Sequence, residues 1–267
     1  MTILAFQRTI LSWYKTNRRD LPWRNTKDPY KILVSEVMLQ QTQVARVIPK
    51  YEEFLKAFPN LRILARASTP RLLKVWAGLG YWKRALALKE TARTIQKNYK
   101  GKFPKDSALL DALPGIGPYT AGAVSCFAFG NAEAFLDTNI RRVYLHFFFL
   151  KRKDVSDKEI LKIAEKAVWK KNPREWHYAL FDYGATMLKN SGANRRSRHY
   201  TKQSKFENSF RSFRTKVVNF LLSQKQNRAS KKTIESLLKE SPYPTKEVIS
   251  SLLKDRLIKQ SSAHYFL

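Results

Sequence analysis

The segment LPGIGPYTAGAV, residues 113–124, has the residue types and spacing of a phosphate-binding turn. Gly115 and Gly117 lie between two stretches with helical periodicity. Glycine permits positive φ and lets a backbone approach another chain closely. The free N–H groups that open the following helix suit a phosphate. The segment therefore predicts a helix-hairpin-helix that contacts a nucleic-acid backbone, and an αα-hairpin without a ligand is the alternative.

Two acidic residues, Glu36 and Asp137, could have either a catalytic or a structural role. Glu36 lies between Val34 and Val37 in the sequence. Burial among apolar side chains would favour its neutral, proton-donating form. Asp137 directly precedes Thr138, where another helical run begins. The structural alternatives are a surface helix carboxylate for Glu36 and an N-cap for Asp137. Asp137 could do both jobs.

The charge of the chain favours a polyanionic partner. Lys and Arg number 51 against 21 Asp and Glu, so the formal net charge is +30 and the pI is near 10.3. A positive field of this strength makes nucleic acid the first candidate partner and an anionic membrane the second. The alternative is that the source organism has generally basic proteins, so that the charge has no specific partner. No apolar run approaches the roughly 18 residues of a membrane span, and the N-terminus lacks a small-residue cleavage site. We expect a cytoplasmic protein, nucleoid-associated in a prokaryote.

The chain has a single cysteine, Cys126, in the apolar run AGAVSCFAFG. One cysteine excludes an internal disulfide, a cysteine-held cluster and a cysteine zinc site. A lone cysteine in such a run is expected to be a buried small hydrophobe.

Periodicity and composition divide the chain into three parts. Residues 1–188 form a succession of amphipathic helices punctuated by Pro and Gly, so this part is predicted to be all-α. Residues 189–208 form a basic linker, within a stretch up to residue 232 that has thirteen Lys or Arg and one acid, Glu207. The linker either contacts phosphates or is a solvated tether.

Residues 209–267 predict a small winged helix-turn-helix-like domain. Three short amphipathic stretches precede RLIKQ and HYFL, which are separated by Ser261 and Ser262. The third helix, near Thr245 to Asp255, would face a DNA groove in that layout. A protein–protein role is the alternative to direct DNA contact.

The sequence resembles the helix-hairpin-helix DNA glycosylase superfamily, and within it the MutY-type adenine DNA glycosylases. The resemblance covers about Trp13 to Met187 and implies a mainly α, two-lobed helical core. It rests on five blocks in order: LPWR (21–24), SEVMLQQTQV (35–44), GLGYWKRA (78–85), LPGIGPYTAGAV (113–124) and LDTNIRRV (136–143).

The resemblance implies the chemistry of N-glycosidic bond hydrolysis, which needs an acid for the leaving base and a carboxylate for the oxocarbenium-like sugar. By similarity, Glu36 protonates a purine ring nitrogen and Asp137 stabilises the sugar cation. Tyr119 occupies the position where strand-cleaving members have a lysine that forms a Schiff base. A phenol cannot form that imine, so a monofunctional enzyme without lyase activity is expected.

The resemblance also implies residues that handle the nucleotide. Gln41 and Tyr81 are expected to enter the helix and fill the gap beside the flipped nucleotide, and Trp23 and Arg24 are expected to meet the base. Thr42 and Tyr178 complete the residues expected at the base pocket and in flipping. Those expected at the DNA backbone are Gly115, Gly117, Tyr119 and Thr120. No metal is expected on side chains, but the main-chain carbonyls of Leu113 and Ile116 could hold a Na⁺ or K⁺ that bridges to a phosphate.

The sequence departs from the family pattern in the region after the core. Most relatives have four cysteines that hold an iron–sulfur cluster, whereas here the first position is Leu188 and the others fall in NSGANRRSRHY. A clusterless member without cofactors is therefore expected. We also expect the small winged-helix-like domain to stand in place of the larger β-rich C-terminal domain of the MutY type. Tyr178 stands where the adenine enzymes have a Gln or Glu that contacts the base.

These features give a primary function and two alternatives. The primary prediction is a monomeric base excision repair enzyme that flips adenine opposite 8-oxoguanine or guanine out of double-stranded DNA. A G·T or G·U mismatch glycosylase is the alternative within the superfamily, because those enzymes also have a Tyr at the position of Tyr119. A non-catalytic DNA-damage-binding protein is the alternative of another class, and retention of Glu36 and Asp137 argues against it.

Overall fold

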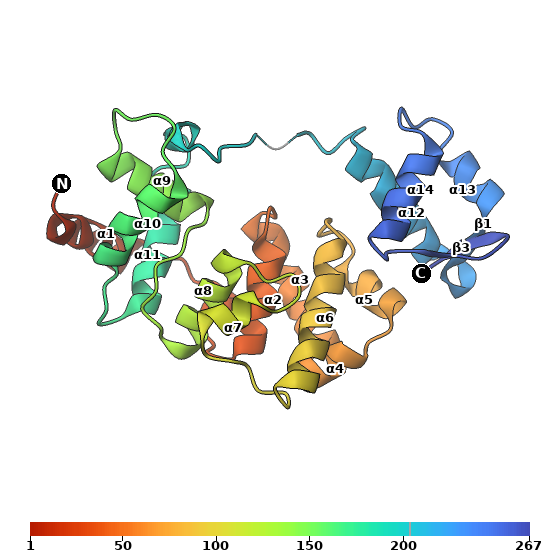
Figure 1. Cartoon of the computed structure of the whole chain (residues 1–267), viewed down its shortest axis with the longest axis horizontal. Coiled ribbons are helices and arrows are strands. Elements are labelled where there is room, and N and C mark those ends of the chain that lie inside the picture. The colour runs from red at the N-terminus through yellow and green to blue at the C-terminus, as the bar shows by residue number, and fades with distance from the viewer. Residues whose placement is uncertain (203) are drawn as a thin grey trace. The chain divides into compact units, whose positions relative to one another are not determined.

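Helices dominate the computed structural model, which describes residues 1–202 and 204–267 (Figure 1). The predicted mainly α fold is confirmed. Contacts within the chain define two compact units, Met1–Glu36 with Phe103–Lys202 and Val37–Lys102 with Gln203–Leu267. The predicted domain boundaries after residues 188 and 208 stay a prediction. Among the described residues, no helix has both the length and the apolarity to cross a bilayer.

The first unit is a bundle of helices whose starts are fixed by side-chain caps and prolines. Ser156 and Glu159 form a capping box, and Pro118 and Pro173 occupy the first helical turns that they open. Its elements are α1 (Ile3–Asn17), η1 (Pro22–Arg24), the first part of α2 (Pro29–Leu39), α7 (Ser107–Asp111), α8 (Pro118–Phe129), α9 (Thr138–Phe148), α10 (Asp157–Ala167), α11 (Pro173–Thr186) and η2 (Ala193–Arg196).

Aromatic side chains fill the core of this unit. The ring of Phe6 on α1 lies 5.0–5.5 Å, centroid to centroid, from the rings of Tyr144, Phe148 and Trp176. Tilted and edge-on pairs of this kind are favourable beyond the apolar area that they bury.

Cys126 on α8 is 1% exposed, so its predicted role as a buried small hydrophobe is confirmed.

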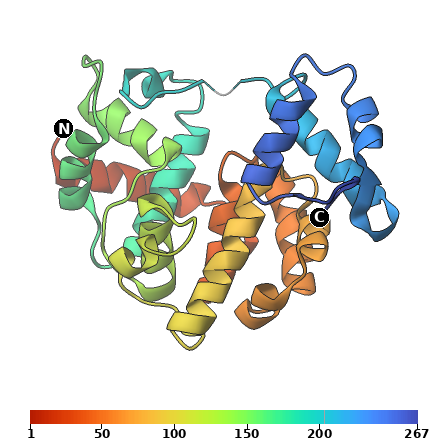
Figure 2. The same ribbon diagram turned by 45° about the vertical axis from the view of Figure 1, so that its right-hand side comes forward.

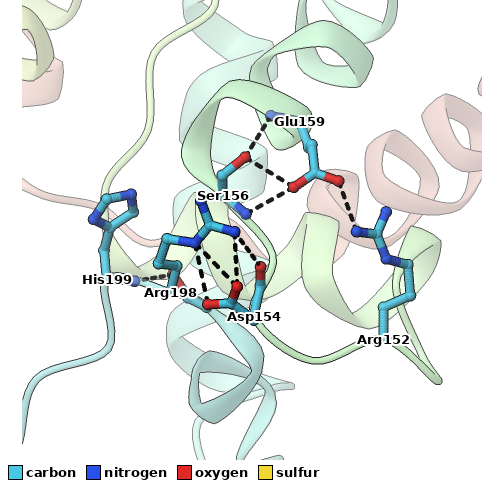
Figure 3. A network of polar contacts seen from close by, with 7 residues as sticks. Arg152, Asp154, Ser156, Glu159, Arg198 and His199 are labelled. Carbon is cyan, nitrogen blue, oxygen red and sulfur yellow. Dashed lines mark hydrogen bonds and ion pairs between the residues drawn. The ribbon is translucent and has the colours of Figure 1, made fainter.

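The segment after α11 is held to the α9–α10 connection by polar contacts. Val155 pairs with this segment through two backbone hydrogen bonds, to Arg196 O (2.9 Å) and from Arg198 N (3.0 Å). Arg198 forms an ion pair with Asp154 (2.7 Å), and the neighbouring Arg152 forms one with Glu159 (2.7 Å), as Figure 3 shows. Arg196 and Arg198 lie in NSGANRRSRHY, the segment in which the sequence resemblance would place cluster cysteines.

The second unit combines a helical lobe with the C-terminal domain. Its elements are the end of α2, α3 (Val44–Ala57), α4 (Leu61–Arg66), α5 (Thr69–Trp76), α6 (Lys83–Asn98), α12 (Phe210–Ser223), η3 (Lys225–Asn227), β1 (Arg228–Ser230), α13 (Lys231–Leu237), α14 (Thr245–Lys254), β2 (Lys259–Gln260) and β3 (His264–Phe266). The predicted order of three helices and a terminal hairpin is confirmed. Sequence reasoning missed β1, which pairs with β3 in an antiparallel sheet of order β1-β3-β2 beside α13 (Figure 2).

Gly184 on α11 allows α11 to approach the first turn of α9. A Cβ built on Gly184 would lie 2.4 Å from the main-chain oxygen of Asn139 and 2.8 Å from its carbonyl carbon. The backbone of Asn139 belongs to the turn that Asp137 caps. The absence of a side chain at residue 184 thus helps to set the position of Asp137.

We predict that Gly184→Ala destabilises the protein although alanine is the better helix former. The gain in helix propensity is about 1 kcal/mol, whereas overpacking against a backbone that cannot rotate away costs about 1–3 kcal/mol. A contact of 2.4 Å with a backbone oxygen belongs to the upper part of that range, about 2–3 kcal/mol, so urea unfolding should show a net loss of roughly 1–2 kcal/mol. Met187→Ala, at an exposed position three residues later, is the control and should change stability little. Equal stabilities of Gly184→Ala and the wild type would show that the helices separate freely here.

Candidate active site

Glu36 is a buried carboxyl group on α2 with one phenol as its hydrogen-bond partner. Its residue is 4% exposed, and Tyr119 Oη donates a hydrogen bond to its Oε2 at 2.5 Å. Burial raises the pKa of Glu36 to about 7, the hydrogen bond from Tyr119 opposes the rise, and the charge of Asp137 adds to it. The predicted burial of Glu36 is confirmed, and the surface alternative is wrong.

Tyr119 is positioned by the hairpin that precedes it. Gly117 is the N-cap of α8 and Pro118 is its first residue, so Tyr119 lies in the first turn of the helix. Its ring packs edge-on against Phe135 and Phe181, with centroids 5.9 and 6.5 Å away. Burial and the neighbouring charge of Glu36 raise the pKa of Tyr119 well above its usual value. The side chain is therefore a protonated phenol that can donate a hydrogen bond.

Asp137 caps α9 and is held as a hydrogen-bond acceptor. Its Oδ1 accepts from the backbone N–H of Asn139 (2.9 Å) and of Ile140 (2.7 Å), and its Oδ2 accepts from the Asn139 side chain (2.9 Å). Burial raises the pKa of Asp137, while these hydrogen bonds favour its charged form. The predicted N-cap is confirmed, and the charge of Asp137 contributes to raising the pKa of Glu36.

A buried carboxylate that sequence reasoning missed, Asp182, organises the segment that contains Trp23 and Arg24. Arg24 forms two hydrogen bonds to Asp182, of 2.7 and 2.8 Å, and the Arg19 side chain forms a third at 2.5 Å. Asp182 is fully buried. Burial alone would raise the pKa of Asp182, but its bonds with Arg24 and Arg19 lower it overall. Asp182 and its arginine partners are about 160 positions apart in the sequence, and neither hydrophobic periodicity nor residue spacing can indicate a contact over that separation.

Tyr178 lies in a closed stack of rings and guanidinium groups. Its ring is 4.3 Å from the ring of Phe127 at an interplanar angle of 18°. The guanidinium carbons of Arg24 and Arg174 lie 4.5 and 5.6 Å from its centroid. Tyr178 is 6% exposed, and burial raises its pKa above the usual value. The packing explains why an aromatic ring is accommodated where the adenine enzymes have an amide or a carboxylate.

A cavity of about 530 Å³ lies next to this stack. Arg24 and Tyr178 line it, and both interact electrostatically with Glu36. Trp23 is 3% exposed and is not among the lining residues. The other lining residues are Tyr14, Arg18, Arg19, Asp20, Asn25, Asn172, Arg174 and Glu175. Glu36, Tyr119 and Asp137 are not among the residues that line it, so the structure does not bring the predicted acid and its partners to this cavity.

The hairpin glycines differ in backbone conformation. Gly115 has φ +74°, which favours glycine. Gly117 is extended, with φ −116°, and a Cβ there would meet nothing within 4 Å. Glycine at residue 117 therefore leaves the N-terminus of α8 accessible, and it is not needed there for a left-handed backbone conformation. Thr120 is buried at 2% exposure, and the carbonyl of Leu113 accepts a hydrogen bond from Ile116 N (3.1 Å). The cation on the carbonyls of Leu113 and Ile116 stays a prediction.

In the second unit, Gln41, Thr42 and Tyr81 lie on two loops that Arg84 joins. Gln41 and Tyr81 both have positive φ, of +54° and +46°. The Arg84 guanidinium donates to carbonyl oxygens of the first loop, including Gln40 O (2.5 Å), and to Thr42 Oγ1 (3.1 Å). It also donates to Leu79 O (3.0 Å) and Gly80 O (3.3 Å) of the second loop. Burial lowers the pKa of Arg84 to about 10.

Sequence reasoning did not single out Arg84, although it lies inside the GLGYWKRA block. A buried arginine that donates hydrogen bonds to backbone carbonyls cannot be recognised from a periodic sequence pattern. Its position in a matched block was therefore the sequence signal that could have identified it. The structure thus gathers Glu36, Tyr119, Asp137, Arg24 and Tyr178 in the first unit. The predicted residues of the two loops are gathered in the second.

Comparison with known proteins gives a consistent family. The family described as HhH-GPD superfamily base excision DNA repair protein matches residues 34–170. The adenine DNA glycosylase of Buchnera aphidicola subsp. Baizongia pistaciae is 40% identical over 190 residues, which are 69% of this chain and 53% of that protein. That of Mycobacterium tuberculosis is 44% identical over 135 residues, 50% of this chain and 44% of that protein.

The chain spans about half the length of these curated relatives. Among solved structures, a thermostable thymine-DNA glycosylase is similar with a TM-score of 0.64 and 30% identity, over 73% of this chain and 94% of that one. An endonuclease III–DNA complex, 20% identical with a TM-score of 0.61, shares the fold. The chain therefore belongs to the HhH-GPD superfamily of base excision DNA repair proteins.

Proposed function

We propose that this protein is a monofunctional DNA N-glycosylase that removes adenine opposite 8-oxoguanine or guanine during base excision repair. The observation that carries the proposal is the buried Glu36, which accepts a hydrogen bond from Tyr119 and whose pKa of about 7 provides an acid at neutral pH. The curated relatives quoted above are adenine DNA glycosylases.

The reaction breaks the bond between the purine nitrogen and the sugar carbon C1′. Glu36 gives its proton to a ring nitrogen of the purine, so the bonding electron pair leaves with a neutral base. Asp137 stabilises the positive charge that develops on the sugar, and its capping hydrogen bonds keep its carboxylate in place. Water then adds to C1′ and returns a proton to Glu36. Tyr119 supplies a hydrogen bond and forms no covalent link to the sugar.

The proposal extends to the partners and cofactors of the chain. The substrate is double-stranded DNA, which the net charge of +30 would attract, and the enzyme acts as a monomer. No iron–sulfur cluster is included, because four cysteines are needed and the chain has one. Among the described residues, no group of three or more His, Cys, Asp or Glu side chains is arranged to hold a metal ion.

We predict that the full chain releases adenine from a duplex with adenine opposite 8-oxoguanine, and that Glu36→Gln abolishes this. Loss of a general acid typically costs 10²- to 10⁴-fold in rate, so the variant should be slower by at least about 100-fold under single-turnover conditions. Alkali-induced strand cleavage at the abasic site measures the product.

Parallel duplexes with G·A, G·T, G·U and hypoxanthine distinguish the alternatives. Release of thymine or uracil in preference to adenine would support the mismatch glycosylase instead. Tight binding of the lesion duplex without release of any base would support the damage-binding protein.

The single-turnover rate should depend on pH through Glu36. The acid form is required, and its pKa is about 7. The rate should therefore be highest below this pH and decline about tenfold per pH unit well above it. A series from pH 5.5 to 9 at constant ionic strength measures this profile. A rate that instead rises through pH 7 would mean that Glu36 acts as a base in the slow step.

Borohydride should trap no covalent complex between the protein and DNA, because the phenol of Tyr119 cannot form an imine. Tyr119→Lys places an amine at the same position and is the positive control, which should yield a trapped band on denaturing gels. A strong band from the wild type would show that another amine attacks the sugar and that the enzyme is a lyase.

A further inference from the structure

Tyr81, which the sequence resemblance expects to enter the DNA helix, has two guanidinium groups near its ring. The guanidinium carbon of Arg84 is 5.3 Å from the centroid of its ring, and that of Arg211 is 5.1 Å away. Arg211 also donates a hydrogen bond to Tyr81 Oη. Arg84 opens helix α6 of the lobe, whereas Arg211 lies on α12 of the C-terminal domain. All three residues belong to the second unit.

Further contacts connect the residues that follow Tyr81 to the C-terminal domain. Trp82 Nε1 donates a hydrogen bond to Thr215 Oγ1 at 3.3 Å. Arg211 and Thr215 are four residues apart on α12 and therefore share one face of that helix. Lys83 forms an ion pair with Asp255 at 3.0 Å, and Asp255 also pairs with Arg214 of α12. Tyr81, Trp82 and Lys83 thus each contact the domain.

The loop that contains Tyr81 needs such support. It includes Gly78 and Gly80 with φ of +92° and +69°, and Tyr81 itself has a positive φ that is uncommon for a non-glycine residue. A wedge residue replaces the base stacking that is lost on eversion. It works best when its side chain is already ordered before it meets DNA, because otherwise the entropy lost in ordering it opposes insertion. Arg84 fixes the base of the loop through main-chain carbonyls, and Arg211 contacts the tip of the Tyr81 side chain.

We propose that α12 of the C-terminal domain is a brace for the wedge loop and that Arg211 is a positioning residue for nucleotide eversion, acting through Tyr81. The inference rests on the proposed function, because it takes Tyr81 as the wedge. Arg211, Arg214, Thr215 and Asp255 all lie beyond residues 34–170, which match the family. The brace therefore assigns a task in the reaction to a part of the chain outside that match.

The test follows eversion separately from base release. A duplex with 2-aminopurine at the target position is titrated with full-length protein in the Glu36→Gln background, where fluorescence rises as the base unstacks. Arg211→Gln should lower the saturating fluorescence roughly 3- to 10-fold, the loss expected from one cation–π contact and one charge-assisted hydrogen bond. With Glu36 intact, the same substitution should lower the single-turnover rate by a similar factor.

Two further variants identify the cause. Arg228→Gln removes the same charge from an exposed residue of the same domain and should leave the fluorescence at saturation unchanged. In a Tyr81→Leu background, Arg211→Gln should have no additional effect, because the ring through which it acts is gone. Circular dichroism of each variant checks that the helices are retained.

The outcomes separate this inference from the proposed function. Full eversion by Arg211→Gln, or equal losses with and without Tyr81, would overturn the brace while leaving the glycosylase intact. A wild type that releases no base, but whose eversion still depends on Arg211 through Tyr81, would overturn the proposed function and leave the brace standing.

Discussion

The site depends on one constraint, which is that a carboxyl group is buried with a phenol as its partner. Water would hold Glu36 ionised at neutral pH, so removing water from it is what raises its pKa to about 7. The hydrogen bond from Tyr119 opposes that rise. The arrangement keeps both protonation states accessible near neutral pH. A general acid that must be reprotonated in each cycle requires this balance.

Arginine side chains hold the surrounding backbone in this protein. Arg174 donates to Phe127 O (2.7 Å) and to Thr26 O (2.6 Å), which fixes the loop after η1 against α8. Arg196 donates to Leu145 O (3.1 Å) and Leu150 O (2.9 Å) at the end of α9. Guanidinium groups have several fixed donors and stay charged when partly buried. The contacts of Arg196 and those of Figure 3 hold the segment after α11 to the end of α9 and to the α9–α10 connection.

Sequence reasoning predicted local features well and long-range polar pairs poorly. Helix periodicity, the cap at Asp137 and the turn at Gly115 each depend on a few neighbouring residues, and the structure has all three. The burial of Glu36 followed from its apolar neighbours. Asp182 could not be predicted, because its partners Arg19 and Arg24 are more than 150 residues away. The short strand β1 was missed because three residues with a polar start show no alternation.

Under the proposed function, the hairpin would couple DNA contact to chemistry through its geometry. The open N-terminus of α8 begins at Gly117 and Pro118, and the hydrogen bond to Glu36 comes from Tyr119, the next residue. A phosphate held by the free N–H groups at this N-terminus would therefore be bound by the same helical turn as the residue that contacts Glu36. Under the proposed function, binding the backbone there fixes where the everted nucleotide meets the acid. The short GIGPY segment then serves both affinity and catalysis, because neither contact can move without the other.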